Sequence, residues 1–127
     1  MTGDAVTLNE LSHRVVGCAW TVARALGTGF AEKNYENALA HEIRKAGLAV
    51  AQQRGIMVWY DGVIIGEYTA DLLVEEVLLV ELKTVRTLDD SHRGQCVNYL
   101  KATGLGLCLL LNFGTPRMEI RRVVLGL

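Results

Sequence analysis

The charged residues that interrupt the apolar stretch from Gly66 to Arg86 (GEYTADLLVEEVLLVELKTVR) carry the clearest chemical signal in the sequence. Asp71 lies in the first half of this stretch, and Glu81 and Lys83 form a Glu-x-Lys pattern in the second half. Charges within strands of Val and Leu need either a solvated face or a shared site, because burying them singly is costly. Two carboxylates and an ammonium suit a divalent metal and a phosphate oxygen. The alternative interpretation is an ordinary cross-strand ion pair on a solvated face.

The register of this predicted hairpin decides whether the three groups meet. Glu81 and Lys83 are two residues apart on a strand, so their side chains share one face. A two-residue turn would place Asp71 opposite Val80, whereas a three-residue turn at Glu75–Val77 places it opposite Glu81. We predict the second register because it also gathers the apolar residues on one face. That face comprises Leu72, Val74, Leu78, Val80 and Leu82.

Length and composition predict a single domain over residues 1–127, with a flexible N-terminus of about residues 1–6. Half of the residues are hydrophobic and 21% are charged, so disorder is not expected elsewhere. The formal net charge of −1 provides no global positive field for a polyanion. This balance counts against a dedicated high-affinity nucleic-acid binder, but it allows an enzyme that meets phosphates locally.

Cysteine usage and hydropathy bear on the compartment. Cys18, Cys96 and Cys108 have no paired spacing, so no metal–thiolate site is indicated. An odd number of cysteines without a signal peptide fits a reducing environment, which predicts a cytoplasmic protein. No apolar run approaches the ~18 residues that would span a membrane.

Two helices are predicted in the first third of the chain. Apolar residues recur at spacings of three and four from Leu8 to Leu26, where Thr7 or Asn9 caps the helix and glycines end it. A second helix, over about 31–46, begins with Glu32, an acid that the helix dipole favours at this position. Its predicted stripe comprises Tyr35, Ala38, Leu39, Glu42 and Ile43.

The remainder alternates mainly as strands. Segments 50–54, 56–60 and 63–68 are predicted strands, with a hairpin turn at Asp61–Gly62. A helix over 92–103 is capped by one of residues 89–91, and strands follow at 105–113 and 118–124. The expected fold is α/β (α+β), a mixed sheet flanked by helices, with Trp20 and Trp59 in its core. Uncovered sheet edges and the apolar tail favour a homodimer.

Several ordered blocks of the sequence resemble one family. Residues Gly29–Tyr35 (GFAEKNY) match a Gly-x-x-Glu-x-x-Tyr signature, and the blocks GEY-x-ADLLVE, Val80–Lys83, His92–Gly104 and Leu111–Gly114 follow in order. Over nearly its whole length the chain resembles the GxxExxY proteins, a bacterial group of the PD-(D/E)XK nuclease-like superfamily. The resemblance implies a restriction-endonuclease-like core.

The same resemblance implies roles for individual residues. Asp71 and Glu81 would ligate Mg²⁺, for which Mn²⁺ could substitute, together with the backbone carbonyl of Leu82. Lys83 would orient the attacking water or offset charge on the phosphate. Glu32 resembles an additional acid near the metal, and Gln95 a supporting polar group. The further positions that could contact substrate or support the site are Tyr35, Tyr68, His92 and Tyr99, although core or helix-start roles are the simpler interpretation of these residues.

The sequence departs from the family pattern at the end of the first helix. Ala23 stands where the family often has histidine, and Thr28 where it has proline. The predicted function is a magnesium-dependent nuclease or phosphodiesterase that uses a metal-activated water. The alternative is a non-catalytic module of the same fold that binds nucleic acid or an unidentified protein partner. In a third interpretation the carboxylates only form ion pairs with Lys83.

Overall fold

The computed structural model describes residues 7–125, so the expectation of a flexible segment at 1–6 lies outside the described residues. The elements in chain order are α1 (Leu8–Leu26), α2 (Glu32–Lys45), β1 (Val50–Tyr60), β2 (Val63–Val74), β3 (Leu78–Lys83), α3 (Asp90–Thr103), β4 (Leu107–Asn112) and β5 (Glu119–Val123). The strands form one sheet in the order β1-β2-β3-β4-β5. Strands β3 and β4 are parallel and every other neighbouring pair is antiparallel, which confirms the predicted mixed sheet.

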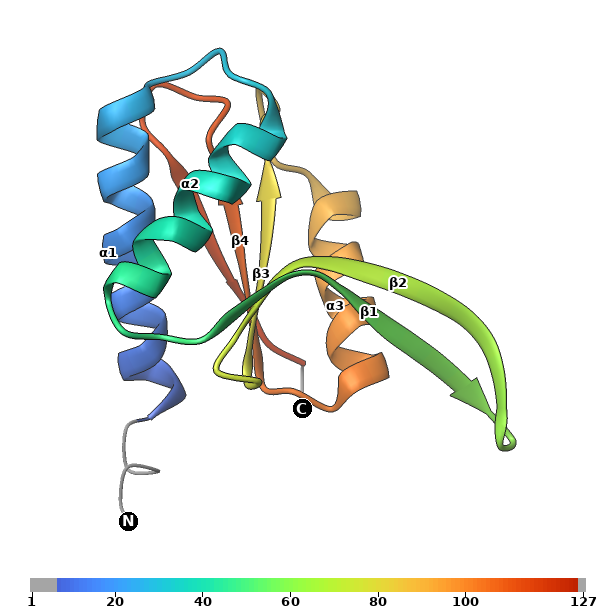
Figure 1. Ribbon diagram of the computed structural model, residues 1–127. Helices are drawn as coiled ribbons and strands as arrows, with labels where there is room; N and C mark the ends of the chain where they lie inside the picture. The colour runs from blue at the N-terminus through green and yellow to red at the C-terminus, as the bar shows by residue number, and fades with distance from the viewer. Residues whose placement is uncertain (1–6, 126–127) are drawn as a thin grey trace.

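The helices divide between the two faces of the sheet, with α1 and α2 on one face and α3 on the other (Figure 1). The five apolar residues predicted to share a face all pack beneath α1 and α2. The alternate residues Leu73 and Leu79 pack with Tyr99 and Leu100 of α3. Because both faces are covered, the central strands are apolar on both sides, as is typical of buried sheets. No helix of the described part of the chain has the length and apolar character needed to cross a membrane.

Local sequence explains the ends of the helices. The Thr7 hydroxyl accepts a 3.0 Å hydrogen bond from the Glu10 amide, which caps α1, and Gly27 ends that helix with φ 64°. At α3 the cap is Asp89, whose carboxylate accepts bonds from the amides of Ser91 and His92. The His92 Nδ1 atom accepts a 3.0 Å bond from the Asp89 amide in return. Both caps lie among the candidates that the sequence predicted.

The buried side of α2 differs from the predicted stripe. Ala38 and Glu42 are only partly buried, whereas Glu36 and Ala40 are buried together with Tyr35. The physical reason is that α2 contacts both α1 and the sheet, so its covered surface is wider than one stripe and is rotated relative to it. This rotation brings an unexpected acid, Glu36, into the interior.

Strands β1 and β2 are longer than predicted and form an arm that extends beyond the body of the protein (Figure 1). The turn at Asp61–Gly62 is confirmed, with φ values of 51° and 75°. Trp59 lies on this arm and is 61% exposed, so its predicted place in the core is wrong. An alternating pattern does not reveal whether a second layer covers the strand. Trp20 is half-buried against the core, with the Arg117 guanidinium 5.6 Å from its ring centre.

Asn112, at the end of β4, holds the loop that follows β3. Its Oδ1 atom accepts bonds from the amides of Val85 and Gly114, both at 3.0 Å. Its Nδ2 atom donates to the Val85 carbonyl at 2.9 Å and to Glu119 Oε1 at 2.7 Å. The Phe113 amide donates to the Lys83 carbonyl at 2.8 Å. The buried Asn112 side chain therefore fixes the end of the strand that carries Lys83.

Candidate active site

Asp71 and Glu81 face each other where strands β2 and β3 separate. The backbone pairing of these strands runs through Leu72 opposite Val80, so the next residues along are Asp71 and Glu81, in the predicted register. Their side chains continue the pairing: the Leu82 amide donates to Asp71 Oδ2 at 2.8 Å, and the Asp71 amide donates to Glu81 Oε1 at 3.3 Å. Each carboxylate is thus held by the backbone of the opposite strand.

Lys83 and Tyr99 surround the second oxygen of Glu81. The Lys83 ammonium lies 3.7 Å from Glu81 Oε2, and the Tyr99 hydroxyl lies 3.4 Å from the same atom. Tyr99 also donates to the Thr69 carbonyl at 3.1 Å. Glu81 is only 4% exposed, whereas the Lys83 side chain is 19% exposed. Lys83 therefore reaches from the buried carboxylate towards solvent, the position from which an ammonium can meet an incoming phosphate.

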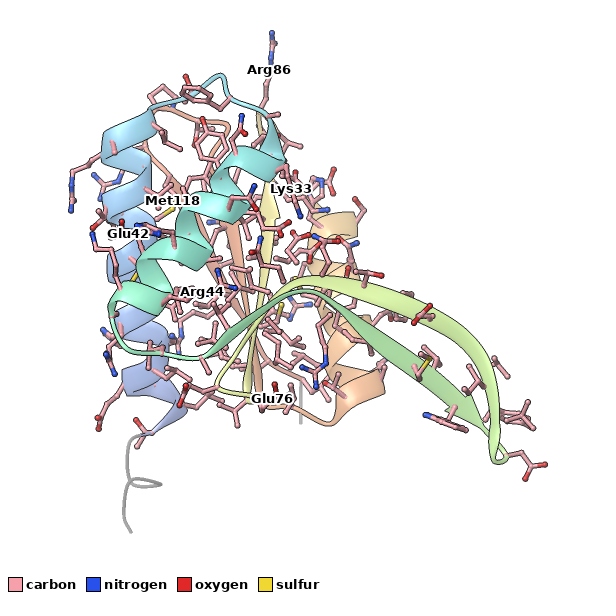
Figure 2. All side chains as sticks on the ribbon, viewed as in Figure 1. Lys33, Glu42, Arg44, Glu76, Arg86 and Met118 are labelled. Atoms are coloured by element: carbon pink, nitrogen blue, oxygen red, sulfur yellow. The ribbon has the colours of Figure 1, made fainter. Side chains whose placement is uncertain are left out.

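Helix α2 adds two further acids to this region. Glu32 is half-buried, and its charge acts on Glu81. Glu36, one turn later, is 3% exposed and was not predicted. Its carboxylate accepts bonds from Gln53 Nε2 at 2.6 Å, Gln52 Nε2 at 2.7 Å and Lys33 Nζ at 2.9 Å. Lys33 extends from α2 in Figure 2. The spacing of Glu36 from Leu39 and Ile43 is the sequence signal that could have found it.

Gln53 connects Glu36 to Asp71. The same Nε2 atom that binds Glu36 lies 3.3 Å from Asp71 Oδ1. Gln53 also has a φ of 54°, in the left-handed region that a non-glycine residue adopts at a cost. It stands between Gln52 and Arg54, whose partners on β2 are Leu72 and Ala70, and so lies opposite Asp71. Backbone strain and a bridging amide thus coincide at this carboxylate.

Three carboxyl groups of this region, those of Glu81, Asp71 and Glu32, have raised pKa values. Burial, followed by the charge of Asp71, raises the pKa of Glu81 from its ordinary 4.5 to about 8. Burial also raises the pKa of Asp71, although the hydrogen bond from the Leu82 amide opposes the shift. The pKa of Glu32 is raised by burial and then by the charge of Asp71. Lys83 lowers all three values without cancelling the shifts. The cluster is therefore short of positive charge, which a bound cation would supply.

We expect the metal-free protein to lose stability as the pH rises from about 4.5 to about 8. In this window folded Glu81 keeps a proton that the unfolded chain has released, so each step upward in pH favours unfolding. Below the window Glu81 is protonated in both states and imposes no cost. Glu81→Gln should reduce the dependence of the free energy of unfolding on pH. The weaker contributions of Asp71 and Glu32, which have the same sign, should remain.

Urea unfolding across this pH range measures the slope of the free energy of unfolding against pH. An unchanged slope in Glu81→Gln, with Glu67→Gln on the exposed arm as the control, would contradict the assignment.

The donor atoms fit a hard divalent cation. Asp71 and Glu81 offer carboxylate oxygens, and Mg²⁺ is commonly held by one or two carboxylates while keeping several waters. Within residues 7–125 no three His, Cys, Asp or Glu side chains form a ready-made metal cluster. A closed zinc site, which needs four protein ligands rich in nitrogen or sulfur, is therefore not present in that part of the chain. The arrangement suits Mg²⁺ or Mn²⁺.

A cleft of about 700 Å³ opens beside the cluster, between Lys83 and the first turns of α3. Tyr68, His92 and Gln95 line it. Tyr68 is 38% exposed, and its ring centre lies 5.7 Å from that of Tyr99. Among the described residues Gln95 makes no hydrogen bond to the carboxylates, so its supporting role stays a prediction. His92 faces the cleft while its Nδ1 atom caps the helix.

Tyr35 lies apart from this cleft, in the core. It is fully buried, and its ring stacks on Phe113 at 4.8 Å between ring centres. Its hydroxyl donates to the Gly27 carbonyl at 2.5 Å and accepts a bond from the Phe30 amide at 3.3 Å. This burial excludes contact with substrate, the role that the sequence had left open. Tyr35 instead closes the loop before α2 and so fixes where that helix, with Glu32, begins.

Comparisons with known proteins bear on the fold and the family of the chain. The family model described as "PD-(D/E)XK nuclease superfamily" matches residues 9–123. A search of curated proteins finds no match. Among solved structures, the protein SSO0001 superposes with a TM-score of 0.59 at 15% identity, over 76% of this chain and 49% of that one. This chain therefore spans about half the length of SSO0001.

A second solved structure is the alkaline exonuclease LHK-Exo from Laribacter hongkongensis. It superposes with a TM-score of 0.50 at 17% identity, over 94% of this chain and 83% of that one. At these identities the two superpositions show a shared fold. The family match covers almost all of the described residues, from the second residue of α1 to the end of β5. The chain therefore belongs to the PD-(D/E)XK nuclease superfamily.

Proposed function

We propose that this protein is a metal-dependent nuclease that hydrolyses phosphodiester bonds in nucleic acid, with Mg²⁺ or Mn²⁺ as its cofactor. The observation that carries the proposal is the placement of Asp71 opposite Glu81, with Lys83 between Glu81 and the cleft. Membership of a nuclease superfamily supports it, as does the likeness to a protein described as an alkaline exonuclease. The Gly29–Tyr35 motif supports a place in the GxxExxY group.

The residues of the cluster have separate tasks in this proposal. Asp71 and Glu81 would hold the ion, with the Leu82 carbonyl as the further ligand. When bound, Mg²⁺ would lower the pKa of water and offset charge on the phosphate. Glu32 adds negative charge that strengthens the attraction for the cation. Lys83 would bind a phosphate oxygen and orient the substrate at the mouth of the cleft.

The charge distribution limits how the substrate is held. A net charge of −1 gives no long-range attraction for nucleic acid, so phosphate contacts must be local. Lys83, His92 and Arg93 line the cleft and provide such contacts. Tyr68, the partly exposed aromatic residue there, could stack on a base. We therefore expect weak binding in the absence of the metal.

Lys83→Met is the variant that separates metal binding from catalysis. Because Lys83 is not a metal ligand in the proposal, calorimetry should show that the variant binds Mn²⁺ at least as tightly as the wild type. Cleavage of mixed single- and double-stranded DNA and RNA should fall by about 10²-fold or more, since the charge that meets the phosphate is lost. Lys45→Met, at an exposed lysine of α2, is the matched control. Wild-type protein that cleaves none of these substrates with either metal would refute the proposed activity.

A non-catalytic nuclease fold is the second candidate. The observation in its favour is the Glu81 pKa of about 8, which leaves this carboxyl largely protonated at neutral pH without a metal. Such a protein would bind nucleic acid or a protein partner and retain the acids only as a buried network. Binding of nucleic acid that weakens steeply with added salt, together with no calorimetric signal for Mg²⁺ or Mn²⁺, would favour this candidate.

A further inference from the structure

The arm formed by residues 57–69 exposes an unusual amount of apolar surface. Seven of its large hydrophobic residues are at least 38% exposed, with Trp59, Tyr60 and Ile65 above 60%, whereas Val58 is only partly exposed. The complete set is Met57, Trp59, Tyr60, Val63, Ile64, Ile65 and Tyr68. Their exposed fractions correspond to roughly 700 Å² in total, which is divided between the two faces of the arm because successive residues point to opposite sides. A surface of this kind indicates a docking site.

The charge of the arm excludes a polyanion as its occupant. From Gly55 to Ala70 the sequence contains no Lys, Arg or His, and its only charged residues are Asp61 and Glu67. Nucleic acid and anionic membrane surfaces both require positive charge where they dock. The arm therefore suits an apolar protein surface. Of its seven exposed hydrophobic residues, Tyr68 lines the cleft assigned to the substrate and the other six do not.

The backbone of the arm also offers an unpaired edge. Strand β1 is the outermost strand of the sheet, so its outer edge has no neighbouring strand within the described residues. Proteins usually protect such an edge with Lys, Pro or a covering segment. Residues Met57–Tyr60 include no Lys or Pro, and the pairing of β1 with β2 has a register shift between Val58 and Trp59. This edge can accept a further antiparallel strand.

We propose that a second copy of this chain covers the arm, with the two β1 edges pairing antiparallel about a two-fold axis. The exposed area of each arm is close to the ~800 Å² that each partner buries in a stable interface. Antiparallel pairing brings the acidic tip of each arm, at Asp61, beside the base of the other arm. Arg54 is already paired with Glu76 at 2.8 Å, so the exposed Lys101, which lines a groove beside Trp59, is the cation that Asp61 of the other copy can meet.

The surface beside the arm is also shaped to receive a partner. A groove of about 300 Å³ lies between the arm and α3, lined by Ile56, Met57, Leu79 and Leu105 among others. A neighbouring groove of about 280 Å³ is lined by Trp59, Tyr68 and Lys101. Aromatic anchors entering apolar pockets dominate the energy of many interfaces. Each copy thus presents both the aromatic residues and the grooves, as a two-fold interface requires.

Trp59→Glu tests the proposal, because a charge there would be buried between the arms. Light scattering should give the wild type about twice the chain mass of 13.9 kDa. The variant should dimerise at least about 30-fold more weakly. Its far-ultraviolet circular dichroism and melting temperature at monomeric concentrations should match the wild type, since Trp59 is not in the core. Ile65→Glu, at another residue of the arm, should behave in the same way.

Val124→Glu is the matched control, because Val124 is 51% exposed beside β5, the other edge of the sheet. It should leave the dimer intact. Hydrogen exchange supplies a second readout: the amides at the outer edge of Met57–Tyr60 should gain protection as the protein concentration rises. A monomeric wild type at all concentrations would overturn the proposal. A dimer that Val124→Glu disrupts and Trp59→Glu does not would also overturn it. So would amides of Met57–Tyr60 that gain protection from hydrogen exchange only when nucleic acid is present.

Discussion

Asp71→Asn is expected to lower metal-dependent cleavage by at least about 10²-fold while leaving the fold intact. The estimate follows because even residues that support a metal ligand typically contribute 10–100-fold, and a ligand contributes more. Asparagine keeps the oxygen that accepts the Leu82 amide at 2.8 Å, so the β2–β3 junction should persist. What changes is the charge available to a cation. Asp71 is partly buried and close to other acids, so its charge is costly in the metal-free protein, and the variant should be at least as stable as the wild type at pH 8.

Glu81→Gln provides the parallel test. Glutamine can accept the Asp71 amide through its oxygen and donate to the Tyr99 hydroxyl through its nitrogen, so packing is retained. Cleavage activity should fall, whereas the free energy of unfolding at pH 8 should rise. Changes in these opposite directions indicate a residue that serves function and destabilises the fold. Single-turnover cleavage and urea unfolding of the same preparations measure both quantities. The control is Asp90→Asn, at an exposed acid in the first turn of α3. Full activity with reduced stability in Asp71→Asn and Glu81→Gln would mean that these residues serve the structure alone.

Asn112→Leu is expected to lower the free energy of unfolding by about 3–5 kcal/mol. Leucine is similar in size but forms none of the four hydrogen bonds that the Asn112 side chain makes. The amide and carbonyl of Val85 and the amide of Gly114 would lose partners in a partly buried loop. Gly114 packs directly against the backbone of Val85, where a Cβ atom would clash with the Val85 carbonyl oxygen. Little space is available for water to replace the lost bonds.

Equilibrium unfolding in urea measures this effect, with Asn98→Leu on the exposed side of α3 as the matched control. The control should change the free energy of unfolding by no more than about 0.5 kcal/mol. Cleavage by Asn112→Leu below its unfolding temperature should also fall, because the loop that Asn112 holds begins directly after Lys83. A loss of stability below about 1 kcal/mol would show that water replaces these hydrogen bonds.

The register of the central hairpin could be predicted because side chains alternate along a strand. Fixing one cross-strand pair therefore fixes the face on which every other side chain of the hairpin lies. A slip by a single residue would have placed Asp71 opposite Val80 and separated Leu72 from the face that it shares with Val80, so the combined pattern of charged and apolar residues favoured one register. That register placed Asp71 opposite Glu81. Helix α1 and the turn at Asp61–Gly62 were predictable for a similar reason, since caps and turn residues act within a few positions of themselves.

Other features depended on which surfaces are covered, and this is a property of the whole fold. Glu36 resembled a solvated helix residue until the rotation of α2 brought it against Gln52 and Gln53. Gln53 gave no local sign of its positive φ, because the strain is offset by contacts from distant segments. The ion pair between Arg54 and Glu76 likewise joins residues that are far apart in the sequence, so local patterns do not predict it (Glu76 is labelled in Figure 2).

The sequence by itself therefore determined the acidic pair, its register and the elements that carry it, because these depend on periodicities of two and 3.6 residues along the chain. Only the tertiary structure decided that Tyr35 is enclosed in the core, that Glu36 supports Asp71 through Gln53, and that Trp59 stands on an uncovered arm. Burial depends on the layer that packs above a residue. That layer comes from parts of the chain far away in sequence, so local patterns do not encode it.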